Sequence, residues 1–235
     1  MYLTVLDTSS LTVQLMDIYD RLYTAYGPQY WGPGDSPFEV IGGAILTQAA
    51  AWTNVEMALA QMKHAGCWSL ESVINIPEEE LALLVRSSGY FNAKARKLKA
   101  FADHVAINYQ GDLNLFLSKP SGLLRDELLS IYGIGEETAD DIMVYAAGQP
   151  SFVIDTYTRR IMDRIGMTPN AVRPRYADYQ AVFHSFIPRQ IQLYNEFHAL
   201  WDRHGKDICT KVDPNCKICC LLDVCSAGKR IMCGF

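Results

Sequence analysis

The apolar residues of this chain recur every three or four positions, and no segment shows the alternation of apolar and polar residues expected of a half-buried strand. The first such pattern follows the polar residues at 8–10 and predicts an amphipathic helix. It consists of Leu11, Leu15, Ile18, Leu22 and Tyr26. A more continuous apolar segment begins at Pro37 and predicts a buried helix. The pattern as a whole predicts an all-α protein.

Two further helix starts are marked by their first residues. Pro77 precedes three glutamates, and proline followed by acids at the positive end of the helix dipole is typical of a helix N-terminus. Asn92 is predicted to cap the next helix. The outer face of that helix is predicted to carry the basic residues Lys94, Arg96, Lys97 and Lys99. These residues form either an ordinary solvated face or a local positive patch.

The segment 121–148 predicts two short helices joined by a tight turn at Gly133-Ile134-Gly135. A glycine-containing turn that opens a helix can direct consecutive backbone N–H groups toward an anion. Taken alone, the pattern favours a plain corner between two helices.

Composition and charge narrow the classes of function. The 235 residues are 49% hydrophobic and 20% charged, which allows one large domain or two small ones. The sequence offers no apolar stretch long enough for a bilayer and no secretory signal, so we expect a cytoplasmic protein. The formal charge of −5 argues against a protein that coats nucleic acid by bulk attraction, but it permits phosphate contacts on one face.

The cysteines give the sharpest chemical signal, because all except Cys67 lie between positions 209 and 233. The candidate ligands are Cys209, Cys216, Cys219 and Cys225. Structural zinc sites usually pair two C-x2-C segments, and this loop has one. Four thiolates spread along one loop suit the larger [4Fe–4S] cluster, with zinc as the alternative. Cys67, Cys220 and Cys233 are expected to be small buried residues.

Asp155 is a candidate for both structure and chemistry. It follows the apolar pair Val153-Ile154 and precedes a helical pattern, so it is predicted to be an N-cap. A capping carboxylate near a helix N-terminus stays ionised.

The cysteine spacing near the end of an all-helical chain resembles the cluster loop of the endonuclease III-like DNA glycosylases, in the helix-hairpin-helix (HhH-GPD) superfamily. The resemblance runs from about Pro37 to Cys225 and includes the segments 44–48, 89–95 and 203–209. It implies two lobes with duplex DNA bound in the cleft between them. Residues 29–149 would form a six-helix barrel with the hairpin, and residues 1–28 and 150–235 a helical lobe with the cluster.

The resemblance also implies roles for individual residues. The aspartate matching Asp155 is the catalytic group, which stabilises an oxocarbenium-like sugar and orients water. Glu137 stands where bifunctional members carry the lysine that forms a Schiff base, which implies a monofunctional glycosylase. Gln48 and Tyr90 match residues that fill the gap left by an extruded base. The remaining DNA contacts would come from Gly133, Ile134, Gly135, Thr138 and Lys94.

Each of these residues has a plainer interpretation. Glu137 can be an acid in a first helical turn, Gln48 a surface amide, and Tyr90 a loop aromatic.

An aromatic set narrows the substrate. Tyr30, Trp31 and Trp52 resemble the base pocket of the 3-methyladenine DNA glycosylase III branch, in which aromatic faces hold an alkylated purine. A methylated ring is cationic and stacks well on indole. The same aromatics could instead belong to the core. The alanines at 49–51 depart from the polar residues usual in the family at these positions.

Together these features predict a monomeric base excision repair enzyme, associated with the nucleoid in a prokaryote, that acts on double-stranded DNA with a damaged base. An alkylated purine is the first expected substrate. The alternatives are a glycosylase for oxidised or deaminated pyrimidines, with or without lyase activity at abasic (AP) sites, and a non-catalytic DNA-binding protein that keeps the cluster.

Overall fold

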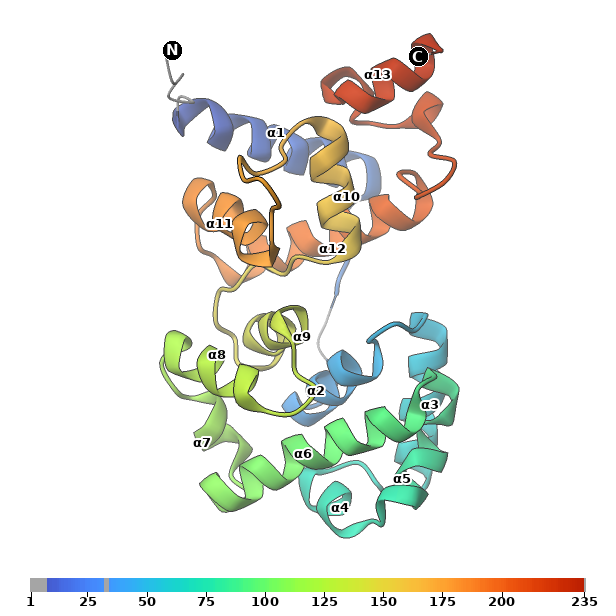
Figure 1. The fold of residues 1–235 in the computed structure, drawn as a ribbon, viewed down its shortest axis with the longest axis vertical. Helices are drawn as coiled ribbons and strands as arrows, with labels where there is room; N and C mark the ends of the chain where they lie inside the picture. Colours follow the sequence, from blue (N-terminus) through green and yellow to red (C-terminus); the bar gives the residue numbers. More distant parts are fainter. Residues whose placement is uncertain (1–7, 32–33, 235) are drawn as a thin grey trace. The chain divides into compact units, whose positions relative to one another are not determined.

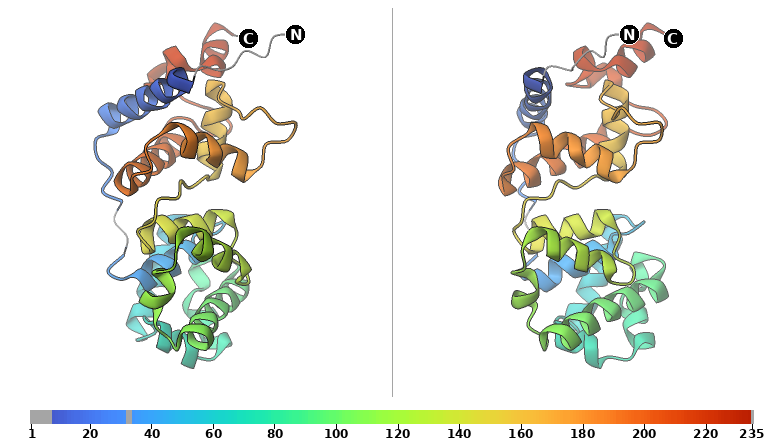
Figure 2. Two further views of the ribbon diagram at one scale, coloured as in Figure 1. Left: turned by 90° about the vertical axis from the view of Figure 1, so that its left-hand side faces the viewer. Right: turned by 60° about the vertical axis from the view of Figure 1, so that its left-hand side comes forward.

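A computed structural model describes residues 8–31 and 34–234, and these residues contain helices and loops but no strand (Figures 1 and 2). The predicted all-α class is therefore confirmed. None of the described helices is long and apolar enough to cross a membrane. The chain forms two compact units: unit 1 is Met1–Trp31 with Pro150–Phe235, and unit 2 is Gly32–Gln149. The first boundary between the two units thus lies after Trp31, whereas the sequence placed this boundary after residue 28.

Unit 2 begins with a buried helix and continues through short helices around a long one (Figure 1). The α-helices are α2 (Pro37–Leu46), α3 (Trp52–His64), α4 (Leu70–Asn75), α5 (Glu78–Leu84), α6 (Phe91–Tyr109), α7 (Leu113–Leu117), α8 (Ser121–Ser130) and α9 (Glu136–Asp141). A 3-10 turn, η1 (Arg86–Ser88), precedes α6, and a π-helical turn, η2 (Ile142–Ala146), continues α9.

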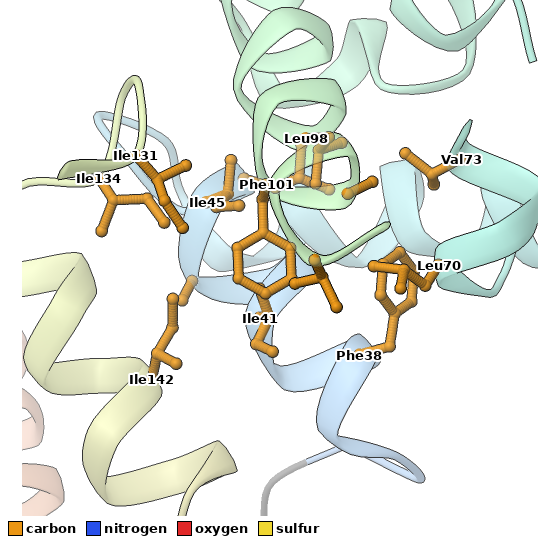
Figure 3. Close-up of a cluster of buried hydrophobic side chains, with 14 of the residues drawn as sticks. Phe38, Ile41, Ile45, Leu70, Val73, Leu98, Phe101, Ile131, Ile134 and Ile142 are labelled. Carbon is orange, nitrogen blue, oxygen red and sulfur yellow. The ribbon is translucent and has the colours of Figure 1, made fainter. Parts of the chain in front are cut away.

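The core of unit 2 forms where α2 and α6 meet. Phe101 of α6 lies at the centre of this cluster, with Ile41 and Ile45 of α2 and Leu98 around it (Figure 3). Ile142 reaches the same cluster from η2. Burial of these apolar side chains is the main stabilising contribution to the unit.

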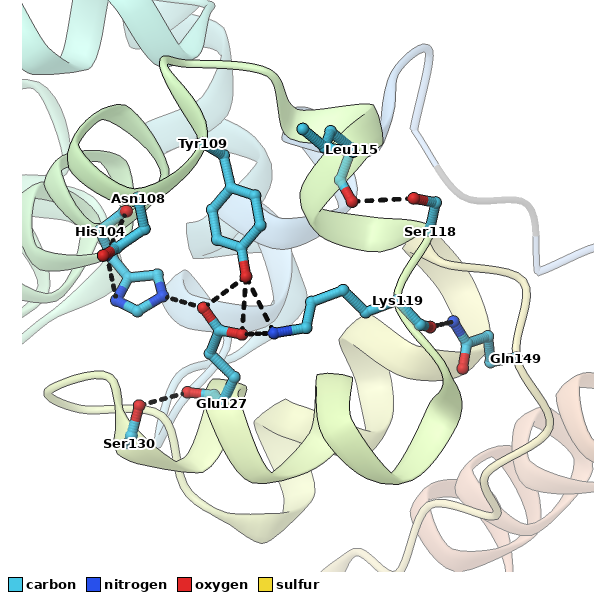
Figure 4. A network of polar contacts seen from close by, with 9 residues as sticks. All are labelled: His104, Asn108, Tyr109, Leu115, Ser118, Lys119, Glu127, Ser130 and Gln149. Carbon is cyan, nitrogen blue, oxygen red and sulfur yellow. Dashed lines mark hydrogen bonds and ion pairs between the residues drawn. The ribbon is translucent and has the colours of Figure 1, made fainter.

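A network of polar side chains links α6 to α8 in unit 2. The Glu127 carboxylate of α8 accepts hydrogen bonds from Tyr109 at 2.8 Å and contacts His104 Nε2 at 2.7 Å (Figure 4). Lys119 pairs with the same carboxylate. Burial acts to raise the pKa of Glu127, but these three partners outweigh burial and lower it to about 2. The network therefore joins α6, α8 and the loop before α8 through an ionised group.

In unit 1, the helix at residues 8–26 packs against helices of the segment 150–234. The α-helices of this unit are α1 (Thr8–Tyr26), α10 (Thr156–Ile165), α11 (Tyr176–Phe186), α12 (Ile191–Asp207) and α13 (Ser226–Cys233), with 3-10 turns η3 (Cys216–Ile218) and η4 (Leu222–Val224). Phe152 stacks on Phe183 with ring centroids 3.7 Å apart, and Trp201 of α12 is fully buried beside them. The extended segment 150–154 is thus fixed in the core immediately before Asp155.

The predicted cap at Asn92 is wrong. Helix α6 begins at Phe91, and its N-cap is Tyr90, in the left-handed conformation with φ 46° and no side-chain cap. Gly89, with φ 70°, precedes it. The chain therefore enters α6 through two consecutive residues with positive φ, a geometry that the capping preference of asparagine does not reveal.

Candidate active site and cysteine loop

Asp155 caps α10, as the sequence predicts. Its Oδ1 accepts a hydrogen bond from the N–H of Thr158 at 2.6 Å, and the residue is 8% exposed. Burial opposes ionisation, but His198 and the Thr158 N–H outweigh burial and hold the pKa of Asp155 below its usual value. The site thus contains a shielded carboxylate that is ionised at neutral pH.

His198, a residue without a signal in the sequence, lies on α12 beside this carboxylate. Nε2 of His198 lies 3.7 Å from Oδ2 of Asp155. The ring of Trp31 meets the His198 ring edge-on, with centroids 5.4 Å apart. The structure therefore connects the candidate carboxylate, through one histidine, to an aromatic residue predicted for the base pocket. A lone histidine in a helical segment carries no sequence signal for this role.

In unit 2, the predicted hairpin is present as α8, the turn 131–135 and α9. Gly133 has φ 84°, and a Cβ there would overlap the side chain of Lys97. Gly135 has an ordinary extended backbone, and a Cβ there would meet open space. Within the described residues, the N–H groups of both glycines have no hydrogen-bond acceptor. Such exposed donors can bind an anion.

Gln48 lies against this hairpin rather than free in solvent. Its Nε2 donates to the carbonyl of Gly133 at 3.0 Å and to Oγ1 of Thr138 at 2.8 Å. Lys97 contacts its Oε1. Thr138 is buried, so its hydroxyl holds the glutamine and does not face a ligand. These contacts fix the Gln48 amide against the hairpin.

The sequence placed Lys94 on the outer face of α6 as a DNA contact, and the structure corrects this placement. Lys94 is 1% exposed, because it occupies the buried stripe that continues through Leu98. Its Nζ donates to backbone carbonyls of the same unit. Lys97 and Lys99 are partly exposed, and Lys99 donates to the carbonyl of Ile74; Arg96 is exposed and pairs with Glu78.

The aromatic residues predicted for base contacts are accessible, not core. Tyr90 is 76% exposed, and Tyr30 is 85% exposed with φ 51°. Trp31 in unit 1 and Trp52 in unit 2 are each partly exposed. Trp52 packs on Gly43 and donates through its indole N–H to Glu56 at 2.9 Å. Glu137 is exposed in the first turn of α9.

The four candidate cysteine ligands line one cavity in unit 1, together with apolar side chains that include Ile208 and Leu222. No group of three or more His, Cys, Asp or Glu side chains in the described ranges converges closely enough to hold a single metal ion. Gly228 leaves room at this cavity, since a Cβ there would lie 3.3 Å from Cys225 Sγ. The donor set and its spacing therefore fit a body larger than one ion.

N–H groups donate hydrogen bonds to the sulfur atoms of Cys209 and Cys225. Arg164 Nη1 donates to Cys209 Sγ at 3.1 Å, and the Gly228 N–H donates to Cys225 Sγ at 3.2 Å. His204 Nε2 lies 3.5 Å from Cys219 Sγ. Burial, the largest cause, raises the pKa of Cys219 to about 11, so this thiol ionises at neutral pH only beside a positive centre.

Comparison with known proteins identifies the family. A family model described as "HhH-GPD superfamily base excision DNA repair protein" matches residues 43–184. The chain belongs to this superfamily. A protein of Methanocaldococcus jannaschii, named "Putative DNA repair glycosylase MJ1434", is 37% identical over 204 residues, which are 86% of this chain and 92% of that protein. Endonuclease III of Sulfolobus acidocaldarius is 26% identical over 223 residues, which are 89% of this chain and 96% of that protein.

Solved structures agree with this assignment. A trapped endonuclease III–DNA covalent intermediate matches with a TM-score of 0.79 and 23% identity, over 94% of this chain and 98% of that chain. The 3-methyladenine DNA glycosylase of H. pylori bound to 1,N6-ethenoadenine matches with a TM-score of 0.69 and 26% identity, over 86% and 98%. The predicted superfamily and its endonuclease III-like family are thus confirmed.

Proposed function

We propose that this HhH-GPD superfamily DNA glycosylase hydrolyses the N-glycosidic bond of a damaged base in duplex DNA and leaves the abasic strand intact. The observation that carries the proposal is the ionised, shielded carboxylate of Asp155. Negative charge in a site of low dielectric strongly stabilises the positive charge that develops on the sugar as the base departs.

In this proposal Asp155 is the catalytic residue in both halves of the reaction. Its Oδ2, which lies 3.7 Å from His198 Nε2, would face the oxocarbenium-like sugar, while Oδ1 remains bound to the Thr158 N–H and fixes the side chain. The carboxylate then orients the water that attacks the sugar. The proton of that water passes to solvent or to the departing base.

The absence of lyase chemistry in this proposal rests on Glu137. A carboxylate cannot form a Schiff base, and this position in the hairpin carries the lysine in bifunctional members. Two lysines of α6 offer no replacement, because Lys94 is buried and Lys97 is bound to Gln48.

The hairpin turn and two side chains form the proposed DNA interface in unit 2. The N–H groups of Gly133 and Gly135 would bind one phosphate, a contact that positions the strand without reading its sequence. Gln48 and Tyr90 would enter the duplex where the base is extruded, and the high exposure of Tyr90 supports this role.

We propose a monomer, located in the cytoplasm, as the acting form.

We propose an alkylated purine as the substrate. Tyr30, Trp31 and Trp52 are accessible aromatic residues, and aromatic faces favour a cationic methylated ring. The similarity to a 3-methyladenine DNA glycosylase bound to ethenoadenine supports this choice. An oxidised or deaminated pyrimidine is the second candidate, favoured by the similarity to endonuclease III of Sulfolobus acidocaldarius.

We propose a [4Fe–4S] cluster as the cofactor, held by Cys209, Cys216, Cys219 and Cys225. When bound, the cluster would cross-link the loop that these cysteines span and add a centre of negative charge. The chain's own contribution is the set of N–H donors around the sulfur atoms and the arginine contacts of α10 with the loop backbone.

The test is base release from a panel of duplexes, each with one lesion, by the wild-type protein and by Asp155→Asn. We expect release of an alkylated purine, an abasic product without a nick, and no adduct after borohydride treatment. Release of no base from any lesion would favour the non-catalytic DNA-binding alternative. A borohydride-trapped adduct would show that a lysine acts as nucleophile despite Glu137.

A further inference from the structure

A buried lysine of unit 2 plays no part in the chemistry proposed above. Nζ of Lys94 donates to the carbonyl oxygens of Leu46 at 2.8 Å and of Ser88 at 2.5 Å. Burial, followed by repulsion from Lys97, lowers the pKa of Lys94 to about 8. A buried cation is costly, and an apolar side chain of similar size would fill the same space at lower cost. The ammonium group therefore calls for a specific explanation.

The two carbonyls belong to the ends of two helices. Leu46 is the last residue of α2, and Ser88 is the last residue of η1. The final carbonyls of a helix lack intrahelical donors and form the negative end of its dipole. One ammonium thus joins two helix C-termini that are far apart in the sequence.

Each of these helix ends leads into a strained residue. Ala49 has φ 52° and Tyr90 has φ 46°, both in the left-handed region that non-glycine residues rarely adopt. Such residues persist where their surroundings fix the backbone on both sides. Gln48 lies between Leu46 and Ala49, and Tyr90 follows Ser88 by two positions. Lys94 is therefore bonded to the backbone just before both candidate insertion residues.

We propose that Lys94 is a positioning residue for base extrusion, whose ammonium fixes the two backbone segments that present Gln48 and Tyr90 to DNA. The proposal rests on the function proposed above. Lys97, three residues further along α6, contacts the Gln48 side chain, so one helix holds both the backbone and the amide at this position. Direct attack by Lys94 on a sugar is excluded by its 1% exposure.

Lys94→Met tests this role, because methionine keeps most of the length and removes the donors. Lys99→Met is the matched control: Lys99 lies on the same helix and donates to the carbonyl of Ile74 at 2.9 Å, outside both segments. The readouts are affinity for undamaged duplex, fluorescence of 2-aminopurine beside the lesion, and single-turnover base release.

For Lys94→Met we expect affinity within about 2-fold of wild type, because the hairpin phosphate contact remains. Base release should fall by about 10-fold or more, with loss of the fluorescence rise, because misplacement of positioning groups is costly. Lys99→Met should match wild type in all three readouts. Wild-type release and fluorescence in Lys94→Met would overturn the proposal.

A double-mutant comparison separates positioning from general stability. Lys94→Gln, measured both in the wild-type background and in a Gln48→Ala, Tyr90→Ala background, should lower release by less than about 2-fold in the second background, because its targets are gone there. An equal loss in both backgrounds, or loss of the fold in both Lys94 variants, would assign the residue to stability and overturn the proposal. If the wild-type protein releases no base, the proposed function fails, while fluorescence on a duplex with an abasic analogue still tests Lys94.

Discussion

Alanine at Gly133 should lower the stability of unit 2, whereas alanine at Gly135 should leave stability unchanged and weaken DNA binding. Gly133 has φ 84°, and a Cβ there would overlap the Lys97 side chain. The left-handed conformation alone costs a non-glycine residue about 1–2 kcal/mol. Displacement of Lys97 would also break its contact with Gln48. We therefore expect Gly133→Ala to lower the free energy of unfolding by about 2 kcal/mol or more.

Gly135→Ala should leave the free energy of unfolding within about 0.5 kcal/mol of wild type. The residue has φ −93° and ψ −179°, which alanine adopts freely, and its Cβ would meet no protein atom within 4 Å. The added methyl group would instead occupy the space through which a phosphate approaches the turn. Loss of one charge-assisted hydrogen bond costs about 1.5–3 kcal/mol, or about 10- to 100-fold in affinity.

The assay is fluorescence anisotropy with a labelled duplex that contains an abasic analogue, at several salt concentrations, together with urea unfolding of each variant. We expect Gly135→Ala to bind at least about 10-fold more weakly at each salt concentration, with an unchanged salt slope, because the lost donor is a neutral N–H group. Wild-type affinity in Gly135→Ala, at unchanged stability, would refute the assignment of this turn as the phosphate contact.

Two further predictions concern the two units separately. Glu127→Gln should lower the free energy of unfolding at neutral pH by about 2 kcal/mol, because the Glu127 pKa of about 2 lies below its unfolded value. This stabilisation is fully present above the pKa of Glu127 in the unfolded chain and is lost as the pH falls through about 2. The free energy of unfolding, measured with urea between pH 5 and pH 2, should therefore depend less on pH in the variant than in wild type. An unchanged pH profile would contradict the role of this network; Glu136→Gln, an exposed acid of the same unit, is the control. Arg164→Met should lower the iron content of the purified protein, because Arg164 donates to Cys209 Sγ and to the carbonyls of Thr210 and Lys211. Arg203→Met, which replaces a more exposed arginine, is the control and should leave the iron content unchanged. Equal iron content in both variants would argue against the support of the loop by Arg164.

The sequence predicted the structure best at residues whose type has a characteristic role in local backbone geometry. Asp155 before a helical pattern predicted an N-cap, and the side chain makes that hydrogen bond. The two glycines of the hairpin predicted a tight turn between short helices, which the structure contains. These features depend on local backbone geometry, which a short segment determines largely by itself.

The sequence misled where tertiary contacts decide. Lys94 lies on the same helical stripe as Leu98 and Phe101, so the apolar periodicity already placed it inward, but its charge suggested solvent. Only the backbone carbonyls of two distant helix ends explain why a lysine is buried there. His198 likewise gains its place beside Asp155 from the packing of α12 against α10, which no local pattern encodes.

The proposed catalytic role of Asp155 is most directly tested by the single-turnover rate of base release in Asp155→Asn. Asparagine caps helices about as well as aspartate, so the fold and DNA affinity should be retained while the charge is lost. Asp112→Asn, which alters the cap of α7 in the same way, serves as the control. The account predicts a fall of at least about 100-fold for Asp155→Asn and none for Asp112→Asn. Release by Asp155→Asn within about 3-fold of wild type would contradict it.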